Sequence, residues 1–298
     1  MLRHLMSTCK LATMHQVQQL LLIAALCVGR TTCAFGCDFA VSTWPMVSFP
    51  KDQDSVEFRL WEHRANHSEH NWVVYRDTHR VCARLLNRHR PNDAPLPFTA
   101  SAGPFSQPRA AVKVKDGWLV GFNRGEWGGA LYWFSPDGAD RYKISDHQIV
   151  DFIQSGDSVL AIQGLAHLSL SEGSILSVRK TSNARRWRVK TILTLPKAPE
   201  ASAMHSNGAL YIVLTDSFVS VDRARHLTTV HPNAAWGLLY PNSLVLDEAN
   251  AKAYIGMRQF VAEVSLVDGT AKYGVPDEDY LNRLPKDVED GIRKQHGG

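Results

Sequence analysis

The chain has 298 residues, of which 44 % are hydrophobic, and a formal net charge of +4 at pH 7. A chain of this length can bury one large core or two smaller ones. The small net charge, with no basic stripe interleaved with aromatic side chains, argues against a nucleic-acid-binding protein.

The first 34 residues have the pattern of a secretory signal peptide. Arg3 and Lys10 precede an uninterrupted apolar run, Leu20–Gly29, and small residues follow it up to Ala34. This run is too short for a membrane span, which needs roughly 20 residues. We therefore expect residues 1–34 to be removed on export, and the mature chain to start near Phe35 with no transmembrane span.

Two of the five cysteines, Cys37 and Cys82, remain in the mature chain. In an oxidising compartment two such cysteines are expected to form a disulfide. The predicted location is periplasmic or extracellular. An alternative makes Cys37 a lipid-anchored first residue, but Phe35 fits poorly just before such a site.

Residues 35–76 are predicted to form an N-terminal β segment. Ser55–Glu62 alternates apolar and polar side chains with period two, and Asn71–Tyr75 reads as a second short strand. Three histidines lie near the polar turn between them: His63, His67 and His70. An exposed loop is favoured over a metal site because no carboxylate or cysteine framework accompanies them.

Residues 77–108 are predicted to form a helix followed by a connector. Asp77–His89 reads as a helix with an apolar stripe that includes Val81, Cys82 and Leu85. Five prolines follow between Arg90 and Pro108, and these indicate a stiff connector.

Residues 109–276 contain one unit repeated four times. Each unit reads as three apolar strands and a more polar fourth strand, separated by turns rich in Gly, Asp and Asn. The expected second strands are Trp118–Phe122, Val159–Gln163, Ala209–Leu214 and Ala253–Met257. Equivalent positions recur 44, 44 and 42 residues apart, at Leu131, Ile175, Val219 and Val261. Four strands at this period are typical of a β-propeller blade of about 40–45 residues.

The sequence therefore predicts an all-β fold, a β-propeller of five to six four-stranded blades with a short N-terminal helix and connector. The N-terminal segment would supply the blades beyond four in a single domain, 35–298, and residues 277–298 would form a tail. A β-sandwich with irregular repeats is the alternative. On these units, Arg109–Pro276 resembles secreted bacterial β-propeller proteins, although WD and kelch signatures are missing. The resemblance is architectural and implies no activity.

Loops between second and third strands, and between consecutive blades, are expected to lie on one face of a propeller. Here they carry charged, amide and aromatic side chains, a mixture that suits a binding site. The expected binding face contains Asn123, Arg124, Glu126, Trp127, His147, His167, Asp216, Trp236, Asn242 and Arg258. Structural roles compete with ligand contact at several of them: core packing for both tryptophans, burial for His167 and pairing with a carboxylate for Arg258.

The predicted function is an exported binding protein that engages a protein or a cell-envelope glycan. No GxSxG, HExxH or CxxC motif is present, so no catalytic residue, metal site or cofactor is predicted. One alternative is an envelope hydrolase or lyase with a carboxylate or metal site over the channel. Another is an immunity or inhibitor protein against a toxin or lytic enzyme.

Overall fold

The computed structural model describes residues 37–50, 52–78, 80–86, 96–155, 158–180, 185–276 and 284–296. Met1–Gly36 and Cys37–Gly298 form separate units, and the expected signal peptide, residues 1–34, lies outside the described residues. In the part of the chain that is described, no helix has the length and apolar character that a membrane crossing requires.

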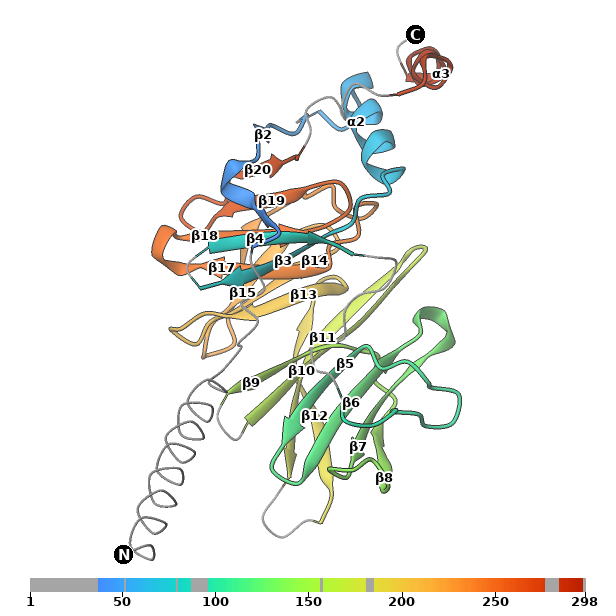
Figure 1. Cartoon of the computed structure of the whole chain (residues 1–298), viewed down its shortest axis with the longest axis vertical. Helices are drawn as coiled ribbons and strands as arrows, with labels where there is room; N and C mark the ends of the chain where they lie inside the picture. The colour runs from blue at the N-terminus through green and yellow to red at the C-terminus, as the bar shows by residue number, and fades with distance from the viewer. Residues whose placement is uncertain are drawn as a thin grey trace, which may run out of the picture. The chain divides into compact units, whose positions relative to one another are not determined.

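The four sequence repeats fold as four antiparallel sheets, which we call blades I to IV (Figure 1). Blade I contains β5 (Ala110–Val114), β6 (Gly117–Asn123), β7 (Gly129–Phe134) and β8 (Arg141–Ser145). Blade II contains β9 (Ile149–Ser155), β10 (Ser158–His167), β11 (Leu170–Lys180) and β12 (Trp187–Leu195). Blade III contains β13 (Pro199–Met204), β14 (Leu210–Leu214), β15 (Phe218–Val221) and β16 (Leu227–His231). Blade IV contains β17 (Ser243–Asp247), β18 (Lys252–Gly256), β19 (Val261–Ser265) and β20 (Ala271–Gly274).

The N-terminal segment supplies a fifth sheet, blade V, with the strand order β1-β4-β3. Its strands are β1 (Phe39–Ala40), β3 (Trp72–Asp77) and β4 (Arg80–Leu85), and the η1 turn (Val41–Thr43) follows β1. The strand β2 (Met46–Val47) instead extends blade IV by pairing with β20. The predicted disulfide between Cys37 and Cys82 is confirmed, with the two Cα atoms 5.5 Å apart, and it joins the residue that lies two positions before β1 to β4.

The strand predicted over Ser55–Glu62 is wrong. The helix α2 (Val56–Asn66) occupies these residues instead. The Ser55 hydroxyl accepts a hydrogen bond from the Phe58 amide at 3.2 Å and so caps this helix. Phe58, Trp61 and Ala65 then fall on one buried face at helical spacing. Two of the histidines expected in an exposed loop accordingly lie at the end of this helix, with their rings stacked 4.0 Å apart: His63 and His67.

The helix predicted over Asp77–His89 is replaced by a strand over its described residues. Cys82 and Ala83 are fully buried in the middle of blade V, between β3 and β1. The spacing of the apolar residues in this segment fits a helix. In the structure, pairing with strands on both sides satisfies the backbone hydrogen-bonding groups and places these two residues in the core. Tertiary pairing has overridden local helix preference.

Adjacent blades pack face to face around separate apolar cores. Val213, Phe218 and Ile255, for example, belong to the core shared by blades III and IV. The first strands are neighbours in the order β3, β17, β13, β9 and β5, so blade V lies beside blade IV (Figure 1). The other face of blade I is covered by the connector, where Ala100, Ala102 and Phe105 pack on Phe122 and Phe134.

A glycine in the second strand lets the first strand of the next blade approach closely. A Cβ atom on Gly121 would lie 2.4 Å from the Ile149 Cβ, and one on Gly256 would lie 2.5 Å from the Trp72 carbonyl oxygen. The same relation thus joins blade I to blade II and blade IV to blade V. Blade V therefore continues the series of blades I to IV, although it precedes them in the sequence.

The C-terminal helix α3 (Lys286–His296) lies within the expected tail, and it contacts α2. Burial lowers the pKa of Arg64 on α2, while the nearby Glu289 raises it and Arg293 lowers it.

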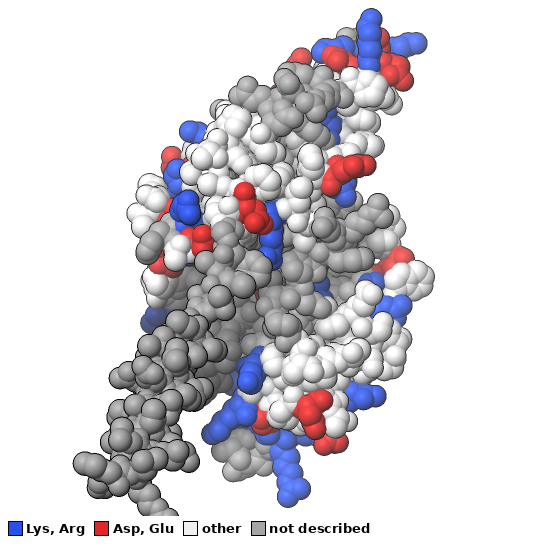
Figure 2. Space-filling view, in the orientation of Figure 1, with Lys and Arg blue, Asp and Glu red and all other residues white. Residues whose placement is uncertain are grey.

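On the face drawn in Figure 2, the Lys and Arg side chains of the described residues are interspersed with Asp and Glu side chains.

Candidate functional site

The expected binding loops do lie at one end of the blades, which we call the loop face. Second strands end there and first strands begin there, as in the antiparallel pairs β5–β6 and β17–β18. The helix α2 runs into β3 at this end, and its Trp61 ring stacks on Phe260 of the β18–β19 loop at 4.8 Å. The loop face of blade IV is therefore partly covered by α2.

Three predicted binding residues are brought together where blade I meets blade II. The Glu126 carboxylate lies 3.2 Å from Nε2 of His167, so the η2 turn (Gly125–Trp127) is held against the end of β10. The Asn123 amide donates to the Gly164 carbonyl at 3.1 Å. Trp127 is next to this contact but points outward, with 71 % of its surface exposed.

Two other predicted residues lie near this junction. The Arg124 guanidinium is exposed and donates to the Pro104 carbonyl at 3.1 Å. Nδ1 of His147 lies 2.9 Å from the Ser145 hydroxyl. Burial lowers the pKa of His147, and the neighbouring Asp146 partly opposes this shift. His147 is therefore held mainly in its neutral form at pH 7.

Arg258 and Asn242 hold the backbone of the N-terminal segment. The Arg258 guanidinium donates to the carbonyl and side-chain oxygens of Asn66, at 2.5 and 3.1 Å, and lies over the Tyr240 ring. The Asn242 amide donates to Asn71 and to the Trp72 carbonyl, at 2.8 and 3.0 Å. Both residues thus join blade IV to the α2–β3 connection. Sequence reasoning anticipated pairing for Arg258 but not these partners.

Trp236 has to be removed from the expected binding face. It is fully buried between blades III and IV, and its indole N–H donates to the Tyr273 hydroxyl at 3.0 Å. Burial raises the pKa of Tyr273 to about 12. A large aromatic ring with one satisfied polar group is a core residue.

The two carboxylates of the expected binding face have different partners. Glu126 contacts His167, whereas Asp216 lies 3.8 Å from the Lys197 ammonium group. Among the described residues, no group of three or more His, Cys, Asp or Glu side chains could hold a metal ion.

The loop face also exposes large apolar side chains: Trp127, Leu168, Leu170, Leu238 and Tyr240. The three leucines were not expected from the sequence. Leu168 and Leu170 lie at the tip of the β10–β11 hairpin, where His167 pairs with Leu170 across a two-residue turn. Leu168 and Tyr240 also have positive φ, 53° and 50°, which bulky residues rarely adopt. The sequence signal for this unusual turn is the pair Leu168-Ser169 at positions where Gly, Asn or Asp is usual.

A second candidate site is a cavity of about 290 Å³ between the first strands. All five blades line it, and its polar wall includes Arg84, Arg109, Asp151, Glu200 and Ser202. None of these residues belongs to the binding face expected from the sequence, because they lie on or next to the first strands rather than in the loops between second and third strands.

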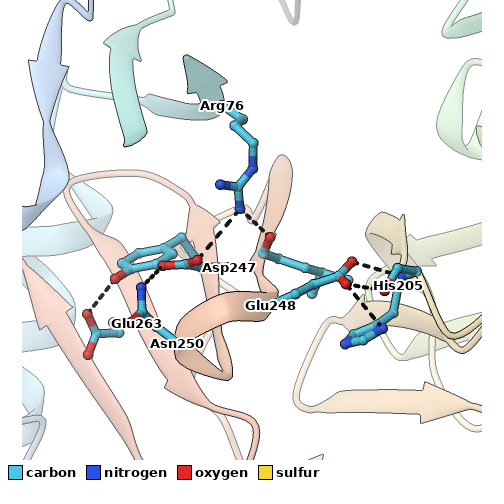
Figure 3. Close-up of polar contacts among 9 residues, drawn as sticks. Arg76, His205, Asp247, Glu248, Asn250 and Glu263 are labelled. Atoms are coloured by element: carbon cyan, nitrogen blue, oxygen red, sulfur yellow. Dashed lines mark hydrogen bonds and ion pairs between the residues drawn. The ribbon is translucent and has the colours of Figure 1, made fainter. Parts of the chain in front are cut away.

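Polar contacts at the opposite ends of the first strands link three blades (Figure 3). Arg76 of blade V donates to the Leu246 carbonyl at 2.5 Å and lies 3.9 Å from Asp247. Glu248 accepts from the Ser206 amide at 2.9 Å, and hydrogen bonds from Ser206 lower the pKa of this carboxyl. These carboxylates have partners within the protein, so this cluster is structural.

Comparisons with known proteins show similarity to parts of several solved structures. No family model and no curated protein matches the chain. A virginiamycin B lyase from Staphylococcus aureus is 13 % identical, with 57 % of this chain and 56 % of that chain covered and a TM-score of 0.39. A gluconolactonase from Xanthomonas campestris is 13 % identical, with 65 % and 61 % covered and a TM-score of 0.37. PorZ of Porphyromonas gingivalis, a surface component of the type-IX secretion system, is 10 % identical, with 67 % and 32 % covered and a TM-score of 0.41. The aligned region is therefore less than two thirds of each of these proteins, and the comparisons assign no family and no activity to this chain.

Proposed function

We propose that this chain is an exported binding protein that docks on a protein partner through its loop face. The observation that carries the proposal is Leu168, which is 94 % exposed at a positive φ on the tip of a hairpin. Holding a bulky residue in this conformation costs about 1 kcal/mol or more. Because the side chain is exposed, burial within the chain does not offset that cost. Burial of the side chain against a partner would offset it.

The surroundings of Leu168 resemble a small protein interface. Trp127 and Leu170 supply further exposed apolar surface beside it, and the Glu126–His167 contact fixes the two loops that carry them. Arg124, Glu126 and His167 place charged or polar groups around these side chains. An apolar centre with a polar rim is typical of protein–protein contacts.

A protein partner is favoured over a glycan because two of the three apolar side chains are leucines. Sugar rings stack on aromatic faces, which Trp127 alone offers here, whereas an exposed leucine fits an apolar pocket of another protein. Export is supported by the disulfide between Cys37 and Cys82, which is typical of oxidising compartments. We place the protein in the periplasm, with the extracellular space as the alternative. A lipid anchor at Cys37 is not compatible with the disulfide, because both would use the sulfur atom of Cys37.

The test is capture of a partner from the envelope extract of the source organism by four purified proteins. These are the wild type, Leu168→Gly, Trp127→Ala and Val267→Ser. Val267 is the matched control because it is 83 % exposed and lies in the β19–β20 turn, at the opposite end of the blades.

We expect one protein to be retained by the wild type and by Val267→Ser. Leu168→Gly should weaken its binding by about tenfold or more, since burial of one leucine contributes about 1.5–3 kcal/mol. The fold of this variant should survive, because glycine accepts a positive φ without strain. Retention that is equal in all four proteins would refute the proposed face. Retention of a glycan instead of a protein would refute the assigned partner class.

A further inference from the structure

The cavity of about 290 Å³ between the first strands, which we call the central cavity, carries charged side chains of both signs on its wall. These side chains belong to different blades. Arg84 belongs to β4 of blade V, and Arg109 directly precedes β5 of blade I. Asp151 belongs to β9 of blade II, and Glu200 to β13 of blade III. The arginines thus come from the two ends of the row of blades, and the carboxylates come from two adjacent blades within it.

The carboxylate of Asp151 is held in a fixed orientation. One oxygen accepts from the Ser202 hydroxyl of blade III at 2.6 Å, and the other accepts from the Phe152 amide at 2.8 Å. These two hydrogen bonds fix the position of the Asp151 carboxylate in the wall of the cavity.

Arg84 offers a positive charge on another part of the wall. Its guanidinium lies over the Tyr75 ring, 5.3 Å from the ring centroid, rather than against a carboxylate of the described chain. The contact with the ring stabilises the guanidinium at this position. A guanidinium in this setting is suited to bind a carboxylate with two parallel hydrogen bonds.

Apolar residues of different sizes complete the wall. Val73, Ala110, Ala111, Val150 and Ala201 line the cavity, together with the larger Phe152 and Leu244. The volume of about 290 Å³ is at the lower end of the range for small-molecule sites. The cavity therefore suits a small ligand with apolar as well as charged groups.

A second hollow of about 220 Å³ lies next to this cavity. It shares Arg109, Val150 and Glu200 with the central cavity and extends to Asn123 and Gly125 beside the η2 turn. The central cavity therefore has this hollow as its neighbour on the side on which the binding loops lie.

We propose that the central cavity binds a small zwitterion, a free amino acid or short peptide with aliphatic side chains. Its carboxylate contacts Arg84 and Arg109, and its ammonium group contacts Asp151 and Glu200. The proposal does not depend on the docking role of Leu168, because it involves neither that hairpin tip nor the other exposed apolar side chains.

The test is binding calorimetry of the full mature chain with alanine, alanyl-alanine and alanyl-alanyl-alanine. Each is compared with its N-acetyl form, which lacks the ammonium group, and with its C-terminal amide, which lacks the carboxylate. The protein variants are Arg84→Gln and Asp151→Asn, with Arg186→Gln as the matched control. Arg186 is exposed and lies over Tyr142 of blade I, outside the cavity.

We expect at least one zwitterion to bind, and both blocked forms to bind about tenfold or more weakly. Arg84→Gln should weaken binding of the zwitterion but leave the already weak binding of the C-terminal amide unchanged. Asp151→Asn should likewise weaken binding of the zwitterion but leave the weak binding of the N-acetyl form unchanged. Arg186→Gln should behave as the wild type does. The proposal is overturned if none of the three zwitterions binds better than its blocked forms. It is also overturned if both cavity variants bind the zwitterion as well as the wild type, with circular dichroism showing that they are folded.

Discussion

Leu168 and Tyr240 share an unusual combination of backbone conformation and exposure. Both have positive φ and large exposed apolar side chains, and both lie on the loop face. Gln259 also has positive φ, but it is buried and accepts a hydrogen bond from Ser68 at 2.6 Å, so its conformation is explained within the fold. Residue by residue, local strain with exposure marks the surface that we assign to a partner.

His147 makes a pH-dependent prediction at the same scale. Burial lowers the pKa of His147 in the folded protein below its ordinary value of about 6.5, so the folded state binds fewer protons than the unfolded state. The free energy of unfolding should therefore fall as the pH drops from above about 6.5 to the pKa of His147 in the folded protein. Below that pKa, His147 should cause no further loss.

The measurement is the urea midpoint at about pH 8 and about pH 5 for the wild type and His147→Gln. We expect a smaller loss on acidification in the variant. His63, whose pKa is lowered first by burial and then by His67, titrates in both proteins and so cancels in the comparison. An equal loss in the two proteins would show that His147 does not contribute.

Among the elements, strands in the repeats were predictable because their signals are local. The expected strand Trp118–Phe122 lies within β6, and Ala209–Leu214 contains the whole of β14. Period-two alternation and turn residues suffice where each strand pairs with its neighbour in the sequence. Ser55–Glu62 failed because its residues fit both periods. Residues 80–85 failed because their apolar spacing fits a helix, and although β3 is their neighbour in the sequence, their second partner, Phe39–Ala40, lies far away.

Close approach between consecutive blades gives a prediction for Gly256→Ala. The new Cβ would lie 2.5 Å from the Trp72 carbonyl oxygen and 2.9 Å from the Val74 amide nitrogen, so backbone would have to move. We expect a loss of about 1–3 kcal/mol in the free energy of unfolding, as is typical of overpacking. Urea unfolding measures it.

Gly237→Ala is the matched control for that substitution. A Cβ at Gly237 has its nearest neighbour, the Thr215 carbonyl oxygen, 4.0 Å away. Its unfolding free energy should stay within about 0.5 kcal/mol of the wild type. If both alanine variants were equally stable, the packing of blade V on blade IV would not have the geometry described.

For the whole molecule, the repeat period predicted blades but not what lies between them. Separations of 42–44 residues identified blades I to IV, while the connector that covers blade I and the charged wall of the central cavity depend on contacts between distant segments. The candidate site was predictable only in part. The loop face was anticipated, but Trp236 lies in the core, Arg258 and Asn242 hold the N-terminal segment, and Leu168 was not selected.

The central claim is that the loop face contacts a protein partner, and site-specific photo-crosslinking tests it most directly. A photoreactive amino acid is placed at position 168, and a second protein carries it at position 267, which is also highly exposed, as a control. After irradiation in the native envelope, the account predicts a discrete protein adduct from position 168 and none from position 267. No protein adduct from position 168, or the same adduct from both positions, would contradict it.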